Sequence, residues 1–406
     1  MRKLLLLLCM PFLFSCVEDD KPDSVVKETF SVTAASNYFG KYDEAYIILH
    51  DLDGKPLEFK QIHDGETIEF QVDKSKKYHV TEYKTDDSSG KHNSFLYTHL
   101  NQELTENLIL STNSSGVVEY APNPVGEFEV NVKNSEPIYS LISAKGYAST
   151  YNESAQSVNN TMKYFSGVDR YLVVAANKSG HNRYQFIDSP ELDKTYSLNY
   201  ETMTEFEHVL KLSTSDYASL AYMITSVNPE SAKNSPEFII KPDFWDFNST
   251  DFYEIGFISD IDNYITFIGG KKNPNSKTQF SYRKLGTAPS EIHVLDIDEI
   301  LVPKSKISDF EVETVVAEVT YTSFFTSPLS YLNGTDFQFL LWTVISGNTT
   351  KFALELPEEL KAANKLITNL DELRLSSVSI SKSMYEKKSV DDQLYELAEV
   401  SQTFEY

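Results

Sequence analysis

The side chains that could carry chemistry in this sequence are its histidines and its carboxylates. The chain of 406 residues holds eight His, 60 Asp and Glu, and two Cys. No two histidines have the HExxH or i, i+4 spacing of a zinc site on a helix. Acidic pairs such as Asp296 with Asp298 could bind calcium or transfer protons. A chain this acidic produces such pairs freely at solvated strand edges, so the sequence predicts no metal and no cofactor.

Motifs of nucleophilic and phosphate chemistry are missing as well. The sequence contains no Gly-x-Ser-x-Gly elbow and no glycine loop of the kind that cradles phosphates or dinucleotides. We therefore expect no catalytic residues. The net charge of −24 argues against a nucleic-acid partner, whose phosphates require clustered Lys and Arg.

An aromatic cluster is the best candidate for a binding site. It contains Trp245, Phe247 and Tyr253, with Asp251 beside them as a hydrogen-bond acceptor. Aromatic rings can stack on the apolar face of a sugar while acidic groups accept hydrogen bonds from its hydroxyls. Alternation also allows these rings to pack inward, so a ligand platform and core packing both remain open. Trp342 lies in a run that is apolar on both faces, and we expect it in the core.

A repeat of β-strands must position these side chains. Tyr78, Tyr171 and Tyr264 each open a strand that is followed by a polar turn and a second aromatic strand. They follow one another at intervals of 93 residues, and Phe337 is expected to open a fourth pair with 352–354 after a shorter interval. Strict alternation, as in 67–72, indicates half-buried strands. A unit of this length suits a sandwich of about seven strands.

The sequence therefore predicts an all-β protein made of tandem, immunoglobulin-like β-sandwich domains with little helix. The expected domains are 27–118, 119–213, 214–302 and a divergent fourth with a C-terminal extension, 303–406. A further apolar strand follows each pair and is expected to complete its own unit. These strands are 108–110, 209–212, 294–297 and 373–375.

Two family resemblances agree with this architecture. The run Asp169-Arg-Tyr-Leu-Val-Val, followed by a Ser-Gly turn, resembles the penultimate strand and loop of fibronectin type III domains. The segment from Asp51 to Val80 is similar to the transthyretin-like modules common in Bacteroidota lipoproteins. Both resemblances imply β-sandwiches.

The N-terminus has the features of an export signal. Residues 1–16 consist of two basic residues and an apolar run too short to span a bilayer, and they end in Leu-Phe-Ser-Cys. This ending resembles a bacterial lipobox, which implies that Cys16 is acylated. The acidic tether at 17–26 is similar to that of Bacteroidota surface lipoproteins. We expect a protein anchored to the outer membrane by its N-terminal lipid and facing the cell surface, with a periplasmic orientation as the alternative.

These observations favour a non-catalytic lipoprotein that acts as a binding or assembly module. Its partner would be a protein, such as an outer-membrane protein, or a polymer. The alternative is a glycan-binding accessory lipoprotein of a polysaccharide-utilisation system. A hydrolase without a recognisable motif is the third hypothesis.

Overall fold

The computed structural model is nearly all β, with 63% strand and 4% helix. The all-β fold predicted from the alternating sequence is therefore confirmed. The residues described are 27–40, 42, 44–86, 91–105, 107–110, 123–134, 137–144, 146–151, 157–177, 181–213, 215–227, 236–241, 252–313, 316–327, 330–331, 337–363, 367–368, 370–384 and 395–404.

The strands form four successive groups, which we call units 1 to 4. Unit 1 comprises residues 27–110 and unit 2 residues 124–205. The strands of unit 1 are β1 (Lys27–Ala34), β2 (Glu44–His50), β3 (Pro56–Gln61), β4 (Thr67–Asp73), β5 (Lys77–Asp86), β6 (Lys91–Glu103) and β7 (Leu108–Leu110). Those of unit 2 are β8 (Pro124–Lys133), β9 (Pro137–Ser143), β10 (Tyr147–Tyr151), β11 (Ser157–Phe165), β12 (Arg170–Asn177), β13 (Asn182–Asp188), β14 (Thr195–Asn199) and β15 (Thr204–Glu205), with the helical turn η2 (Tyr200–Thr202) before β15.

Units 3 and 4 comprise residues 208–286 and 304–403. The strands of unit 3 are β16 (His208–Ser213), β17 (Ser219–Val227), β18 (Pro236–Lys241), β19 (Phe252–Phe257), β20 (Tyr264–Lys271) and β21 (Gln279–Gly286). Those of unit 4 are β22 (Lys304–Lys306), β23 (Asp309–Glu311), β24 (Thr320–Thr326), β25 (Ser330–Tyr331), β26 (Phe337–Gly347), β27 (Lys351–Phe352), β28 (Arg374–Ser383) and β29 (Tyr395–Thr403). Unit 4 also holds the helix α1 (Glu358–Ala363) and the helical turn η4 (Leu370–Glu372).

The first three units share one strand order. Unit 1 has the sheets β4-β1-β7 and β3-β2-β5-β6, and unit 2 repeats them as β11-β8-β14 and β10-β9-β12-β13. Unit 3 keeps β16 with β19 and the order β18-β17-β20-β21. An immunoglobulin sandwich instead pairs its second strand with its first. The all-β, sandwich-type fold is thus confirmed. The immunoglobulin-like arrangement is not confirmed, because the second strand of each of the first three units lies in the other sheet.

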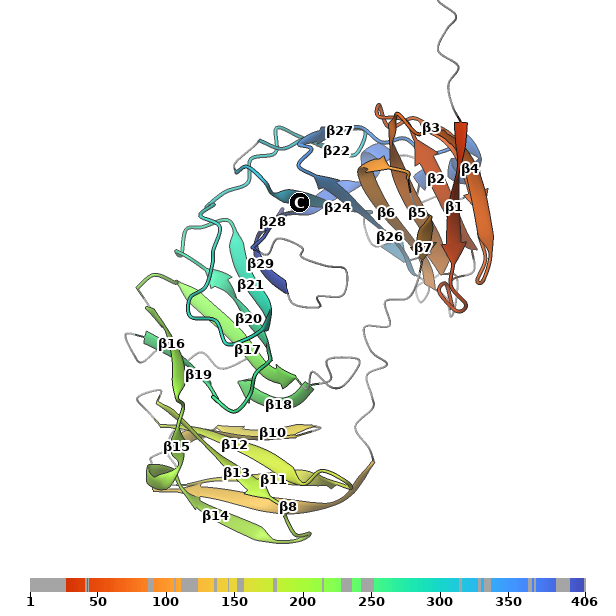
Figure 1. The fold of residues 1–406 in the computed structure, drawn as a ribbon. Coiled ribbons are helices and arrows are strands. Elements are labelled where there is room, and N and C mark those ends of the chain that lie inside the picture. The colour runs from red at the N-terminus through yellow and green to blue at the C-terminus, as the bar shows by residue number, and fades with distance from the viewer. Residues whose placement is uncertain are drawn as a thin grey trace, which may run out of the picture.

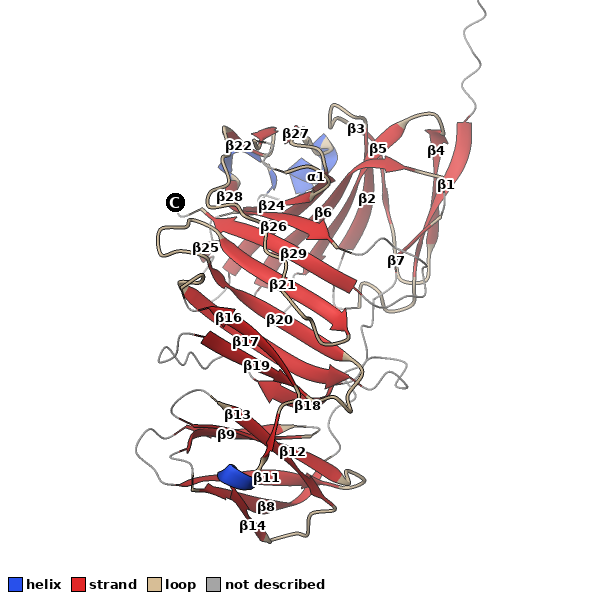
Figure 2. Cartoon of the chain, turned by 60° about the vertical axis from the view of Figure 1, so that its left-hand side comes forward, coloured by secondary structure: helices blue, strands red, loops and turns tan. Residues whose placement is uncertain are grey.

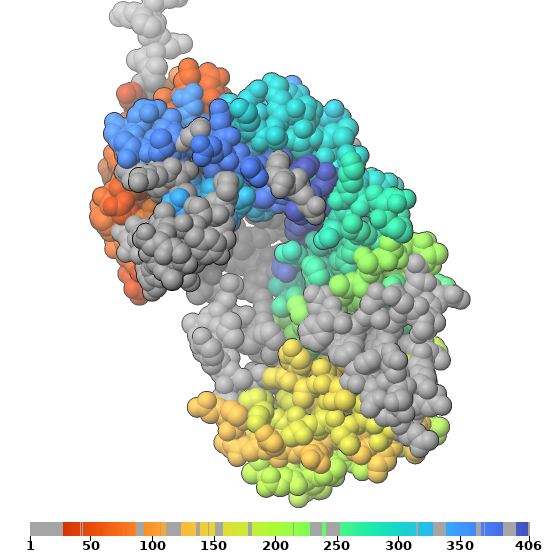
Figure 3. All heavy atoms as spheres, turned by 180° about the vertical axis from the view of Figure 1, so that it is seen from behind, coloured from red at the N-terminus to blue at the C-terminus, as the bar shows by residue number. Residues whose placement is uncertain are grey.

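Three of the four units merge into a single sheet of 13 strands. β21 of unit 3 pairs antiparallel with β29 of unit 4, and β26 of unit 4 pairs parallel with β6 of unit 1. The order in space is therefore unit 3, unit 4, unit 1, and the molecule curves like an arch with unit 2 at the far end (Figures 1 and 2). The space-filling view shows unit 1 beside unit 4, with unit 2 at the opposite end of the molecule (Figure 3).

Buried tyrosine hydroxyls explain the repeat of 93 residues. The hydroxyl of Tyr171 accepts a hydrogen bond from the backbone N–H of Phe165 at 2.9 Å, and that of Tyr264 does the same with Ile258 at 2.9 Å. Tyr78 forms the equivalent contact with the N–H of Asp73 at 2.8 Å. Each tyrosine thus ties the start of the fifth strand to the end of the fourth, which satisfies a buried hydroxyl and fixes the corner.

The prediction of a fourth strand pair is wrong. Phe337 opens β26, which pairs with β24 and β6, whereas Lys351 and Phe352 of β27 pair with β23. The counterpart of the tyrosine-led strand is β28, which pairs with β24 and β29 as β20 pairs with β17 and β21. β28 starts Arg374-Leu375 without a tyrosine, so the residue that marks the repeat is missing.

Of the strands predicted to complete the units, the first does so and two do not. β7 pairs with β1 of its own unit, but β16 pairs with β19 and so opens unit 3 instead of completing unit 2. Residues 294–297 form no strand; Leu295 and Ile297 instead lie over the sheet as buried side chains. Residues 373–375 lead into β28.

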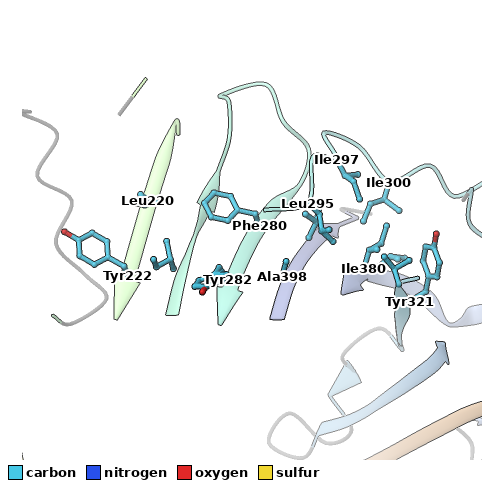
Figure 4. Close-up of a cluster of buried hydrophobic side chains, with 14 of the residues drawn as sticks. Leu220, Tyr222, Phe280, Tyr282, Leu295, Ile297, Ile300, Tyr321, Ile380 and Ala398 are labelled. Carbon is cyan, nitrogen blue, oxygen red and sulfur yellow. The ribbon is translucent and has the colours of Figure 1, made fainter. Parts of the chain in front are cut away.

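One face of the merged sheet carries a row of buried side chains. Figure 4 shows buried side chains from neighbouring strands in a row, with Leu295, Ile297 and Ile300 close to them. Trp342 belongs to the same core and is fully buried, as predicted. The labelled residues of the row are Leu220, Tyr222, Phe280, Tyr282, Ala398, Ile380 and Tyr321.

Candidate functional site

The opposite face of the merged sheet carries a groove in units 3 and 4. Alternation sends Phe280 and Tyr282 into the core, so Gln279, Ser281 and Arg283 project from the other face of β21. The groove has a volume of about 450 Å³. Its lining comes from β17, β20, β21 and β29, namely Ser219, Leu220, Ala221, Phe267, Gly269, Gly270, Lys271, Gln279, Phe280, Ser281, Arg283, Glu399 and Ser401.

Glycine and alanine create the depth of the groove. Gly269 lies opposite Ala221 on β17 and Ser281 on β21, so three small residues stand side by side. A Cβ atom at Gly269 would lie 3.1 Å from the ring of Phe267. The ring therefore leans against the floor at Gly269, and a side chain at 269 would press against the ring.

Polar groups surround this floor. Ser281 pairs with Glu399, and Gln279 pairs with Ser401 on β29. The Ser281 hydroxyl oxygen is buried and has no hydrogen-bond partner among the described residues. A buried polar atom without a partner is unusual and costs stability unless a ligand or water satisfies it.

Two cations flank the ring and the floor. The Arg283 guanidinium lies 5.6 Å from the centre of the Phe267 ring, and Lys271 Nζ donates to the backbone oxygen of Ser276 at 3.3 Å. Among the described residues neither cation has a carboxylate within ion-pair distance. An aromatic ring, a flat floor and unpaired hydrogen-bonding groups can hold a ligand without performing a reaction on it.

The residues predicted as a ligand platform do not lie in this groove as far as they are described. Trp245, Phe247 and Asp251 lie outside the described residues, as does the lipidation candidate Cys16. Tyr253 is 5% exposed and its ring lies 6.5 Å from that of Tyr222, so it packs inward. This placement matches the packing alternative for that residue.

His50 of unit 1 belongs to a hydrogen-bond chain in the core. His50 Nδ1 lies 3.2 Å from the Gly54 backbone oxygen, which can only accept, so Nδ1 carries the proton and Nε2 accepts from the Thr81 hydroxyl at 2.9 Å. Thr98 donates to Thr81 at 2.7 Å and accepts from Trp342 Nε1 at 2.8 Å. Burial lowers the pKa of His50 to about 4, in agreement with the neutral ring that this chain requires.

The acidic pair in the sequence is also bound to the protein itself. Asp296 forms an ion pair with Lys272 at 2.6 Å, and Asp298 accepts from Asn273 at 2.9 Å. Within the described part of the chain, no three His, Cys, Asp or Glu side chains form a possible metal site.

A second aromatic site, in unit 1, already holds a cation. Lys84 Nζ lies 5.0–5.3 Å from the rings of Tyr38, Tyr42 and Tyr97 and 3.1 Å from the Glu82 carboxylate. This arrangement binds an ammonium group by cation–π attraction. Because Lys84 is buried and already paired with Glu82, whereas Arg283 has no such pair among the described residues, the cluster stabilises unit 1 and the groove is the candidate site.

The groove was not predicted from the sequence, although its residues form a pattern there. Phe267-x-Gly269-x-Lys271 and Gln279-x-Ser281-x-Arg283 both alternate with core residues. The pattern does not indicate which face of the sheet stays uncovered.

Comparison with protein-family models and with curated proteins finds no match for this sequence. Across the residues that the structure describes, no helix is long and apolar enough to cross a membrane.

Proposed function

We propose that this protein is a non-catalytic binding module that holds a polymer in the groove of units 3 and 4. The observation that carries the proposal is the Phe267 ring beside the Gly269 floor on an open sheet face. A ring in this position offers an apolar surface, and Gln279, Ser281 and Glu399 offer hydrogen bonds along its border. An extended polymer fits a shallow groove that is lined by four neighbouring strands.

The polymer class favoured by these groups is a glycan. A sugar has an apolar face for the ring and hydroxyls for amide, hydroxyl and carboxylate groups. This assignment selects the glycan-binding hypothesis. Recognition of an outer-membrane protein is the second candidate, and an enzyme has no support from the groups in the groove.

The cellular setting belongs to the same proposal. The signal and lipobox of residues 1–16 support a lipoprotein acylated at Cys16, held in the outer membrane and exposed at the cell surface. Multiple acyl chains give stable anchoring where one gives only marginal binding. Cys16→Ala is expected to abolish acyl labelling, and unchanged labelling would contradict the anchor.

Glycan affinity electrophoresis with the full chain in mild detergent tests the binding site. Phe267→Ala should remove retardation by the bound polysaccharide. Tyr147→Ala is the matched control, because this ring is 49% exposed on unit 2 and does not line the groove. Trp245→Ala tests the aromatic cluster predicted from sequence.

Loss of retardation with Trp245→Ala but not Phe267→Ala would move the site to the aromatic cluster. No retardation by any polysaccharide, together with co-purification of an outer-membrane protein, would favour the assembly role.

A further inference from the structure

We infer that the groove selects a polysaccharide bearing carboxylate groups. This inference rests on the proposed function and adds the charge of the ligand. It starts from the two cations of the groove, Arg283 and Lys271, and from the fact that a strongly acidic chain leaves both without an ion pair among its described residues.

The residues that directly follow these two cations in the sequence lie close to carboxylates. Lys272 follows Lys271 and forms an ion pair with Asp296 at 2.6 Å. Lys284 follows Arg283 and lies 3.9 Å from the carboxylate of Glu396. The chain thus neutralises the adjacent cations and keeps those that face the groove available.

The positions of the two cations suit a polymer that lies along the strands. Arg283 pairs with Phe267 across the sheet, and Lys271 follows Phe267 by four residues on β20. At about 3.3 Å per residue, the backbone positions of the two residues stand roughly 13 Å apart along the strands, with the Gly269 floor between them. That span covers more than one sugar unit, so successive acidic units can reach both cations while one stacks on the ring.

Arg283 has the chemistry for the first contact. A guanidinium binds a carboxylate through two parallel hydrogen bonds, and this pairing is stronger and more selective than a neutral hydrogen bond. Because the guanidinium also lies over Phe267, it holds the charge next to the stacking surface. Glu399 stands two strands from Gly269, roughly 10 Å away, where it can accept a sugar hydroxyl.

The acidic surface as a whole does not prevent this binding. Charges farther than about 8 Å are largely screened at physiological ionic strength. The charge that a ligand meets in the groove therefore comes mainly from the lining side chains. These include two cations, Lys271 and Arg283, and one carboxylate, Glu399.

Calorimetric titration of the full chain in detergent tests the inference with two polymers that differ only in charge. Polygalacturonate supplies the carboxylates, and its carboxyl-reduced form supplies the same linkage without them. We expect polygalacturonate to bind at least about tenfold more tightly, the difference made by one charge-assisted hydrogen bond. Arg283→Gln and Lys271→Gln should each remove most of that preference, while Lys272→Gln, the matched neighbour, should keep it.

The outcomes separate the two proposals. Equal binding of both polymers would overturn the charge inference and leave the glycan groove standing. A preference that survives both Arg283→Gln and Lys271→Gln would place charge recognition elsewhere and also overturn it. Failure of either polymer to bind, with failure of neutral glycans, would overturn the proposed function itself.

Discussion

The buried hydrogen-bond chain of His50 predicts a specific loss of stability in acid. The ring is fully buried, and its Nε2 must accept from Thr81, so the folded protein requires the neutral form. Burial lowers the pKa of His50 from 6.5 to about 4. Between these values the unfolded chain binds a proton that the folded chain does not, so the free energy of unfolding falls as the pH falls.

The size of the effect follows from the two pKa values. At about 1.4 kcal/mol per pH unit, the difference corresponds to roughly 3 kcal/mol lost between pH 6.5 and pH 4. Below the folded pKa of about 4 the histidine contributes no further change. Burial also lowers the pKa of His79 and His99, which adds to the acid sensitivity of the whole protein in the same direction.

His50→Gln isolates this one residue. Glutamine keeps one donor for the Gly54 oxygen and one acceptor for Thr81 but does not titrate. Urea unfolding of both proteins at several pH values gives the difference in their free energies of unfolding. We expect the advantage of the natural protein over His50→Gln to shrink by roughly 3 kcal/mol from pH 7.5 to pH 4. A difference that stays constant with pH would refute a neutral, buried His50; His208→Gln, at an exposed position, is the control.

Three further predictions concern contacts between units 1 and 4 and a corner within unit 3. Gly54→Ala should destabilise the protein by about 2 kcal/mol more than Gly167→Ala: both glycines have φ +79°, but only at Gly54 would a Cβ meet the Ala353 oxygen, at 1.7 Å. Equal unfolding midpoints for the two variants would contradict the tight contact between units 1 and 4. Trp342→Phe should cost about 1–3 kcal/mol, since Thr98 loses its donor, and the loss should be smaller in a Thr98→Val background. Tyr264→Phe should cost about 1 kcal/mol through its bond to the Ile258 N–H, and an unchanged melting temperature would show that this corner does not need its hydroxyl.

The sequence was sufficient to predict the β-sandwich units because their local signals are strong. A tyrosine at the start of the fifth strand fixes a corner through its own hydroxyl, so Tyr78, Tyr171 and Tyr264 report the repeat directly. Unit 4 has lost this residue, and the search for an aromatic found Phe337 on a different strand instead. The error arose because an apolar ring at a strand start can serve the core without closing any corner.

The pairing of units could not be predicted, because it depends on strand edges that are far apart in the sequence. β6 of unit 1 pairs with β26 of unit 4, more than two hundred residues away. Both strands are rich in apolar residues, and such residues indicate a strand but do not identify the strand it pairs with. Which face of a merged sheet remains open follows from this pairing.

The tyrosine at the start of the fifth strand, which we call the anchor, nevertheless allows the outer faces of the units to be compared. The residues one, three and five positions after the anchor point away from the sandwich core. In unit 2 they are Leu172, Val174 and Ala176, all apolar and all buried in the core shared with unit 3.

In unit 1 the equivalent residues include Thr81, which lies in the hydrogen-bond chain that reaches Trp342 of unit 4. In unit 3 the equivalents include Phe267 and Gly269, flanked by Ser281 and Arg283, too polar a set to bury against another unit without partners. Units 1 and 2 therefore use this face to join the arch. The same face of unit 3 is not used in this way, and it is there that we propose the binding site.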